Sequence, residues 1–190
     1  MEERRGTRCK RASKDVKAVP DESASAKAAS ATAVGEIAQW VVFSLDAGRY
    51  ALPLIAVDRI VRAAYITSLP LAPDIVLGAI DIAGRVLPVF NTRRRFRLPG
   101  RTIDPADHLL IARTAQRTVV LVIDAAQGVF ERPTTAMIDA ASIAPDLEHI
   151  HGVIQLEDGL VLIHDLEHFL SPDEARTLDE AMNQQVSHAG

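Results

Sequence analysis

The stretch VLGAIDIAGRVLPVFNTRRRF, residues 76–96, constrains the fold most: two apolar arms meet at an Ala-Gly pair and end in an arginine run. In the first arm Ile80 and Ile82 alternate with smaller or polar residues, which is the two-residue period of a strand with one buried face. The second arm, residues 86–90, is apolar throughout, and its proline excludes a helix interior. The stretch is therefore predicted to form a β-hairpin.

This hairpin pattern occurs twice. The order Gly-x-Ile-x-Ile-x-Gly-x-Val-Leu that begins at Gly78 returns as Gly-x-Ile-x-Leu-x-x-Gly-x-Val-Leu from Gly152, with one extra residue in the second turn. Glycine, strand, turn glycine and strand follow in the same order, which is typical of an internal repeat. The sequence predicts two similar half-domains.

Short apolar segments at about ten-residue spacing fill most of the remaining chain, as in small all-β barrels or sandwiches. One hairpin is expected to turn through a three-residue loop, Asp46–Gly48, with the glycine in the left-handed conformation. An all-β fold is therefore predicted. Its further strands are expected at residues 39–45, 49–54, 57–61, 109–112, 118–123 and 127–131.

Helix is expected only near the C-terminus. Asp165 should cap a short helical turn, and the longer helix should start at Ser-Pro-Asp-Glu, with Ser171 as the cap and Glu174 three residues later. Leu178 and Met182 mark the apolar stripe of that helix.

Composition places the chain among cytoplasmic globular proteins. With 48% hydrophobic and 4% aromatic residues in 190, it can bury a core of aliphatic side chains, anchored by Trp40 and Phe43. The one cysteine, Cys9, excludes an intramolecular disulfide. No window has the roughly 20 apolar residues of a membrane span, and the first residues lack the apolar core of a signal peptide, so no membrane insertion is expected.

The first 36 residues differ in composition from the rest. They are rich in Ala, Ser and charge, and they cannot bury enough surface to offset the entropy of ordering. Their basic front is compatible with nucleic acid or an acidic membrane. A solvated, disordered leader is favoured, because Glu2, Glu3 and Asp15 dilute the basic run and no nucleic-acid reader module follows.

Catalytic motifs are absent from the sequence. There is no Gly-x-Ser-x-Gly, phosphate-binding glycine loop or His-Glu-x-x-His. A zinc-type cluster from His149, His151, His164 and His168 is conceivable, but scattered histidines near a sheet end are usually surface residues. We therefore expect no catalytic residue, metal or cofactor, and no enzyme.

The densest charge in the body is Arg93-Arg94-Arg95-x-Arg97. Such a cluster suits a nucleic-acid footprint or a docking patch for an acidic protein. Because it follows a strand in a net acidic body with few aromatics, protein docking or plain solvation is favoured over nucleic acid.

The spaced order of several short motifs resembles the CheW-like domain of bacterial chemotaxis over about residues 39–170. The resemblance implies two packed five-stranded SH3-like β-barrel subdomains with short helices and a C-terminal helix. It divides the chain into a leader (1–36), a CheW-like domain of two interleaved half-barrels (37–170) and a C-terminal helix and tail (171–190). The motifs are Trp40-Val-Val-Phe-x-Leu, Tyr50-Ala-Leu-Pro-Leu, Val57-x-x-Ile60, Ile66-Thr-x-Leu-Pro, Val76-Leu-Gly-Ala-Ile-x-Ile-x-Gly-x-Val-Leu-Pro-Val and Arg93-x-x-Phe96.

The same resemblance implies a non-enzymatic adaptor. Its partners would be the cytoplasmic tip of a methyl-accepting chemoreceptor and the regulatory domain of a CheA-type histidine kinase, in a cytoplasmic signalling array. The alternative is a divergent CheW-like scaffold retuned to a specialised partner, such as a type IV pilus or twitching system.

The implied receptor-facing groove includes Leu54, Val57 and Arg59, and the implied kinase-coupling region surrounds the central hairpin. The chain departs from the family pattern in having Arg59 where an acidic residue is usual, Ala83 for arginine and Asn91 for aspartate. We hypothesise that Arg59 pairs with Asp81, reversing the polarity of one contact. The expected protein-binding residues are Leu54, Val57, Arg59, Gly78, Asp81, Ala83, Asn91 and Arg93.

Overall fold

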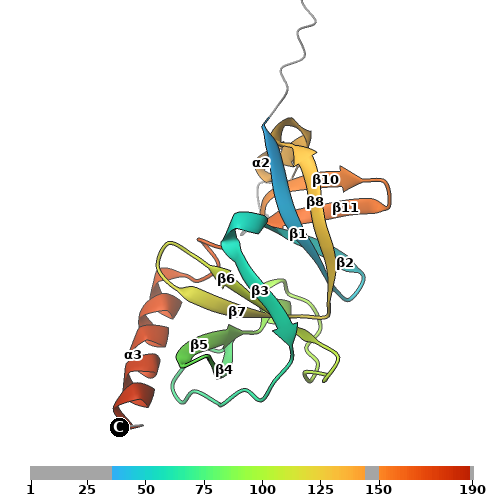
Figure 1. The fold of residues 1–190 in the computed structure, drawn as a ribbon. Coiled ribbons are helices and arrows are strands. Elements are labelled where there is room, and N and C mark those ends of the chain that lie inside the picture. The colour runs from blue at the N-terminus through green and yellow to red at the C-terminus, as the bar shows by residue number, and fades with distance from the viewer. Residues whose placement is uncertain (1–35, 144–149, 189–190) are drawn as a thin grey trace, which may run out of the picture. The chain divides into compact units, whose positions relative to one another are not determined.

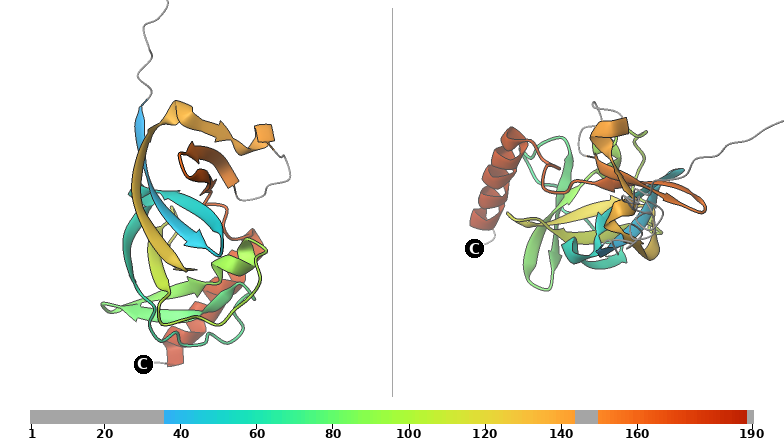
Figure 2. Two further views of the ribbon diagram at one scale, coloured as in Figure 1. Left: turned by 90° about the vertical axis from the view of Figure 1, so that its right-hand side faces the viewer. Right: turned by 90° about the horizontal axis from the view of Figure 1, so that it is seen from above.

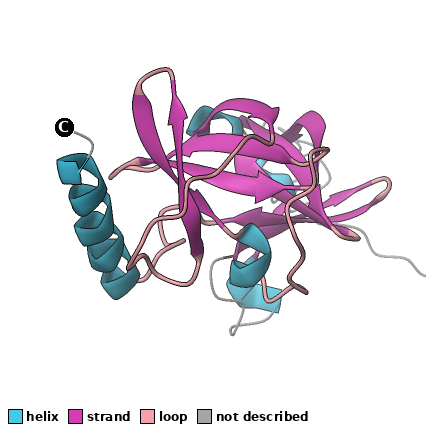
Figure 3. Cartoon of the chain, turned by 90° about the horizontal axis from the view of Figure 1, so that it is seen from below, coloured by secondary structure: helices cyan, strands magenta, loops and turns pink. Residues whose placement is uncertain are grey.

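The computed structural model describes residues 36–143 and 150–188. The predicted leader therefore lies outside the described residues except for its last position. The described chain is mainly β, as predicted, with two sheets and short helical connections (Figures 1 and 3). The helical elements are η1 (Leu54–Ala56), α1 (Thr92–Arg95), η2 (Thr134–Ala136), α2 (Ala140–Ile143) and α3 (Pro172–His188).

The two sheets have six and five strands. The six-stranded sheet runs, in spatial order, β8 (Ala125–Pro133), β1 (Ile37–Leu45), β2 (Gly48–Pro53), β11 (Gly159–His164), β10 (Ile150–Leu156) and β9 (Met137–Asp139). The five-stranded sheet runs β3 (Val57–Arg62), β6 (His108–Arg113), β7 (Thr118–Ile123), β5 (Arg85–Phe90) and β4 (Val76–Ile82). The sixth strand is the short β9, which adds to the five that the resemblance implies.

The two halves of the chain exchange hairpins. The early β1–β2 hairpin lies in the sheet of the late strands β8 to β11, while the later β6–β7 hairpin lies between β3 and β5. Two parallel pairings, β2 with β11 and β5 with β7, join each exchanged hairpin to its host (Figure 2). Each sheet therefore needs strands from both halves of the sequence.

The repeated hairpin is present, and its two copies have the same register. Gly78 faces Val89 in β4–β5, and Gly152 faces Ile163 in β10–β11, a constant offset of 74 residues. Both copies turn through two residues, so the predicted extra residue in the second turn is wrong. The two glycines are not equivalent, because Gly84 lies in the β4–β5 turn whereas Gly159 is already the first residue of β11. Matching them in the sequence therefore suggested an extra turn residue.

Gly78 closes the five-stranded barrel. Its φ is +148°, and Thr67 pairs with the next residue, Ala79, across the gap between the segment after β3 and β4. A Cβ at Gly78 would lie 2.1 Å from the carbonyl oxygen of Thr67. Only glycine allows this close approach of two backbones.

The β1–β2 turn differs from the prediction. It contains two residues, Asp46 and Ala47, and the left-handed residue is Asp46 with φ +52°, while Gly48 already belongs to β2. Aspartate tolerates this conformation better than most residues. Its backbone N–H and its carboxylate are both held by charged side chains, described below.

Strands buried on both faces produce three layers of core. Trp40 and Val42 face the interior of the six-stranded sheet, whereas Val41 and Phe43 face the layer between the sheets. In the same way Leu109 and Leu110 divide between the interior of the five-stranded sheet and the shared layer. This explains why so many strands are apolar throughout instead of alternating. The expected anchors Trp40 and Phe43 are both buried.

The C-terminal helix begins as predicted. The Ser171 hydroxyl accepts the Glu174 N–H at 3.2 Å, and the Glu174 carboxylate accepts the Ser171 N–H at 2.8 Å, which is a capping box. Leu178 is fully buried in the shared layer, which fixes α3 beside the five-stranded sheet (Figure 1). The short helix expected after Asp165 is instead a turn, in which the Asp165 carboxylate accepts the Glu167 N–H.

Candidate functional site

The arginine run after β5 contains a buried cation. The side chain of Arg93 is 9% exposed, and its two terminal nitrogens donate to the two carboxylate oxygens of Asp46 at 2.8 and 2.7 Å. One of them also donates to Asp124 at 2.6 Å. This forked geometry suits the planar guanidinium, so Arg93 connects α1 to the β1–β2 turn and to the end of β7.

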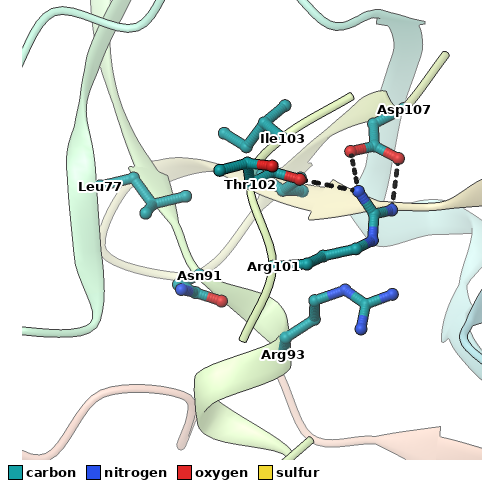
Figure 4. Close-up of a pocket in the computed structure, with 8 residues that line it drawn as sticks. Leu77, Asn91, Arg93, Arg101, Thr102, Ile103 and Asp107 are labelled. Carbon is teal, nitrogen blue, oxygen red and sulfur yellow. Dashed lines mark hydrogen bonds and ion pairs between the residues drawn. The ribbon is translucent and has the colours of Figure 1, made fainter. Parts of the chain in front are cut away.

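A second arginine extends the network. Arg101 donates to both carboxylate oxygens of Asp107, at 2.8 and 2.6 Å, and to Asp124 at 2.6 Å. Figure 4 shows Arg93 and Arg101 side by side at a small hollow, with Asp107 facing Arg101. Asp124 is thus shared between the two cations.

The charges in this network stabilise one another. Burial alone would raise the pKa of Asp107, but hydrogen bonds from Arg101 and from the Asp104 backbone bring it below its usual range. Burial alone would also raise the pKa of Asp124, but hydrogen bonds from Arg93, the Asp46 backbone N–H and Arg101 bring it below its usual range. The pKa of Arg93 is raised, first by its hydrogen bonds to Asp46. Arg93, Asp107 and Asp124 are therefore charged at neutral pH.

Arg94 and Arg95 of the run are paired as well. Arg94 contacts Asp74 at 2.5 Å, and Arg95 contacts Glu174 at the start of α3 at 2.6 Å. Arg95 also lies over the ring of Phe169, 5.5 Å from its centroid. The expectation of a docking patch or a solvated run is wrong for Arg93, because its guanidinium is buried and bound by carboxylates of the same chain.

Two further predicted binding residues have structural positions. Gly78 is buried at the barrel closure. Asn91 caps α1, with its side-chain oxygen accepting the Arg94 N–H at 3.1 Å. Asparagine and aspartate cap helices about equally well, so the departure at Asn91 preserves this local role.

Leu54 and Val57 are half-buried. Both pack against the layer between the sheets, so their apolar atoms support the core more than they form a free surface. Between them, Ile55 on η1 is 92% exposed. The exposed apolar residue of this segment is therefore one that the sequence did not single out.

The hypothesised pair of Arg59 and Asp81 does not form. Arg59 donates instead to Asp58 at 3.1 Å, and Asp81 accepts the Gly84 N–H at 2.7 Å. The two residues do not face each other across paired strands, because β3 pairs with β6, while β4 pairs with β5 and with Thr67 in the segment after β3. Ala83 is exposed in the left-handed turn beside Gly84, with φ +54°.

Arg59 has other charged neighbours at its end of the sheet. Asp58 also accepts a hydrogen bond from Arg113 on β6 at 3.0 Å, and Arg85 on β5 donates to Thr118 at 3.1 Å. The pKa of Asp58 is lowered, first by the hydrogen bond from Arg59 and also by the charges of Arg113 and Arg85. We call Arg59, Arg85 and Arg113 the basic end. Only the strand pairing, which the sequence does not state, brings them together.

Metal ligation finds no support in the described residues, where no group of three or more His, Cys, Asp or Glu side chains is arranged for it. His168 is bound by Asp165 at 2.7 Å, which raises the histidine pKa, and His149 lies outside the described residues. Within the same ranges, no helix is long and apolar enough to cross a membrane.

Comparison with known proteins decides the family. The family model described as "CheW-like domain" matches residues 39–174. The chain belongs to the CheW-like domain family. Members of the CheW family are non-enzymatic scaffolds, so the expectation of no enzyme is confirmed with the family.

Individual relatives agree with this assignment. The chemotaxis protein CheW of Klebsiella aerogenes is 23% identical, with 74% of this chain and 86% of the relative covered. The CheW of Helicobacter pylori is 24% identical over 73% of this chain and 84% of the relative. The crystal structure of the scaffolding protein TtCheW from Thermoanaerobacter tengcongensis superimposes with a TM-score of 0.67 at 22% identity, covering 72% and 94%. That likeness confirms the CheW fold.

Proposed function

We propose that this CheW-like protein is a cytoplasmic adaptor that couples the cytoplasmic tip of a chemoreceptor to the regulatory domain of a CheA-type histidine kinase in a receptor array. The observation that carries the proposal is the family match over residues 39–174 together with the two-sheet fold. An adaptor needs rigid surfaces on one body. The ion-pair network of Arg93 and Arg101 supplies that rigidity by joining the exchanged β1–β2 hairpin to elements of the other sheet.

The exposed residues of the expected surface are Arg59 near η1 and Asp81 and Ala83 at the hairpin tip, and Ile55 on η1 adds an exposed apolar side chain. We assign the first region to the receptor and the tip to the kinase. Leu54, Val57, Gly78, Asn91 and Arg93 shape these surfaces from beneath, and Asp81 fixes the turn that carries the tip.

One observation favours the second candidate, a CheW-like scaffold for a specialised partner such as a type IV pilus or twitching system. Arg59 belongs to a cationic cluster in this chain, whereas the family pattern has an acidic residue there. A receptor surface that suits the usual acidic residue is positively charged, so Arg59 would repel it.

The test is reconstitution with the full chain. The cytoplasmic fragment of a receptor and a CheA-type kinase encoded beside this protein are mixed with and without it, and co-sedimentation and kinase autophosphorylation are measured. Ternary complex formation with a changed kinase rate supports the proposal. Failure to bind either component contradicts it, and binding to pilus-system receptors alone favours the second candidate.

Ile55→Asp gives a matched variant for the receptor face, because the side chain is almost fully exposed and the fold should tolerate the change. We expect it to weaken receptor binding while kinase binding stays. Val129→Asp serves as its control, since Val129 is an exposed apolar residue on β8 of the other sheet.

A further inference from the structure

The basic end of the five-stranded sheet is held in place by the chain itself. One carboxylate, Asp58, contacts Arg59 at 3.1 Å and Arg113 at 3.0 Å, using one N–H of each guanidinium. The two arginine side chains remain 56% and 62% exposed. Each guanidinium has five N–H donors, so the contact with Asp58 orients the groups and leaves donors directed to the surface.

The third arginine of the basic end lies on the β4–β5 hairpin. Arg85, the first residue of β5, is bound to Thr118 on β7 and lies close enough for its charge to act on Asp58. The cations of the basic end therefore exceed the carboxylates that contact them.

The equivalent end of the other barrel is neutralised. The repeated hairpins are offset by 74 residues, so Gly159 is the equivalent of Arg85 in the other barrel. The arginine found there, Arg49, is only 14% exposed and is bound by Asp158 and Gln127. The excess of positive charge is thus specific to one of two similar ends, which indicates a binding role more than a requirement of the fold.

Exposed apolar side chains adjoin the cations along the chain. Val86, next to Arg85, is 44% exposed, and Ile55 on η1 leads into β3 with 92% exposure. Arginine beside exposed apolar residues is typical of protein interfaces. A nucleic-acid site needs a longer basic face, while residues 39–190 hold 13 arginines against 19 acidic residues.

We propose that the basic end, Arg59, Arg85 and Arg113, binds a protein segment that presents at least two carboxylates beside an apolar side chain. This rests on the proposed coupling function, in which the segment belongs to the receptor fragment. The guanidinium pair held by Asp58 receives the carboxylates, and Ile55 meets the apolar side chain. The contact is fixed by charge and is therefore sensitive to salt.

The test measures the dissociation constant of the full chain for the receptor cytoplasmic fragment by biolayer interferometry, at low and high salt. Arg59→Glu and Arg113→Glu should each weaken binding at least about tenfold, with the loss smaller at high salt. The matched control is Arg176→Glu, since Arg176 also contacts a single aspartate at 3.1 Å and is 72% exposed, but lies on α3. We expect it to bind like wild type.

Asp58→Asn separates recognition from a purely structural role. It removes a negative charge and keeps all three arginines, and the asparagine side-chain oxygen can still accept a guanidinium N–H, so the proposal expects binding as tight as wild type or tighter. If the basic end only supports the fold, Asp58→Asn and the arginine variants should weaken binding together. In addition, changing surface carboxylates of the receptor fragment to lysine should restore binding to Arg59→Glu.

The outcomes distinguish this inference from the function on which it rests. If wild type binds neither receptor fragment nor kinase, the proposed function fails. If wild type binds the receptor fragment and the arginine variants bind equally well, the function stands and the acidic-segment inference is wrong. A DNA duplex that binds the basic end more tightly than the receptor fragment would also overturn it.

Discussion

Replacing Arg93 by methionine removes a buried cation while keeping much of the side-chain volume. Its guanidinium joins Asp46 and Asp124, whose side chains are 45% and 22% exposed. Breaking a buried ion pair costs about 3–5 kcal/mol, but Asp46 can regain water and Asp124 keeps Arg101, so we expect a loss of about 2–3 kcal/mol. For a chain of this length, that lowers the melting temperature by about 4–12 °C.

The assay is urea denaturation followed by circular dichroism, with a melting curve beside it. Arg94→Met is the control, because Arg94 is 56% exposed and its partner Asp74 83% exposed, and such surface pairs contribute about 0–1 kcal/mol. A double-mutant cycle with Asp46→Asn should show a coupling energy of about 1 kcal/mol or more between Arg93 and Asp46. Equal destabilisation by Arg93→Met and Arg94→Met would refute the reasoning that the network stabilises the fold.

Acid should destabilise the fold, because the pKa values of Asp107 and Asp124 are lowered in the native state. The free energy of unfolding should be greatest above about pH 5 and should fall as the pH drops through the carboxylate range. Urea titrations at several pH values check this, and Arg93→Met should flatten the slope. Gly78→Ala should cost at least about 3 kcal/mol, because its Cβ meets the Thr67 carbonyl, whereas Gly84→Ala, with nothing within 4 Å, should cost about 1 kcal/mol from its φ of +79°. Thermal melts of both proteins check this, and equal costs would contradict it. Ser171→Ala should cost about 1 kcal/mol and speed hydrogen exchange of the Glu174 amide, and unchanged exchange would argue against the capping box.

Several sequence patterns with a local cause predicted the structure correctly, although those for the Asp46–Gly48 loop and for the helix after Asp165 did not. The alternation around Ile80 and the proline of the second arm define β4 and β5, and the Ser171 capping box defines the start of α3. Each of these signals depends on residues within a few positions, so no knowledge of the tertiary structure is needed. The repeat was also visible, although its glycines gave the wrong register in the second turn.

Contacts set by topology could not be read from the sequence. The arginine run looked like one exposed patch, yet Arg93 is buried against Asp46 in the β1–β2 turn and Asp124 just after β7, which lie 47 and 31 residues away in the sequence. Arg59 was paired with the wrong aspartate because β3 lies beside β6 and not beside β4. The family resemblance gave the fold, but side-chain roles depended on strand order.

The exchange of hairpins has a consequence for how the chain folds. On a ribosome, β1 and β2 emerge long before the strands β8, β10 and β11 that they must join, so the first half alone exposes unsatisfied sheet edges. Folding should therefore wait for nearly complete synthesis, and neither half should be stable by itself. Two co-expressed fragments divided after α1 should associate into one native-like body, since each supplies the hairpin that the other lacks.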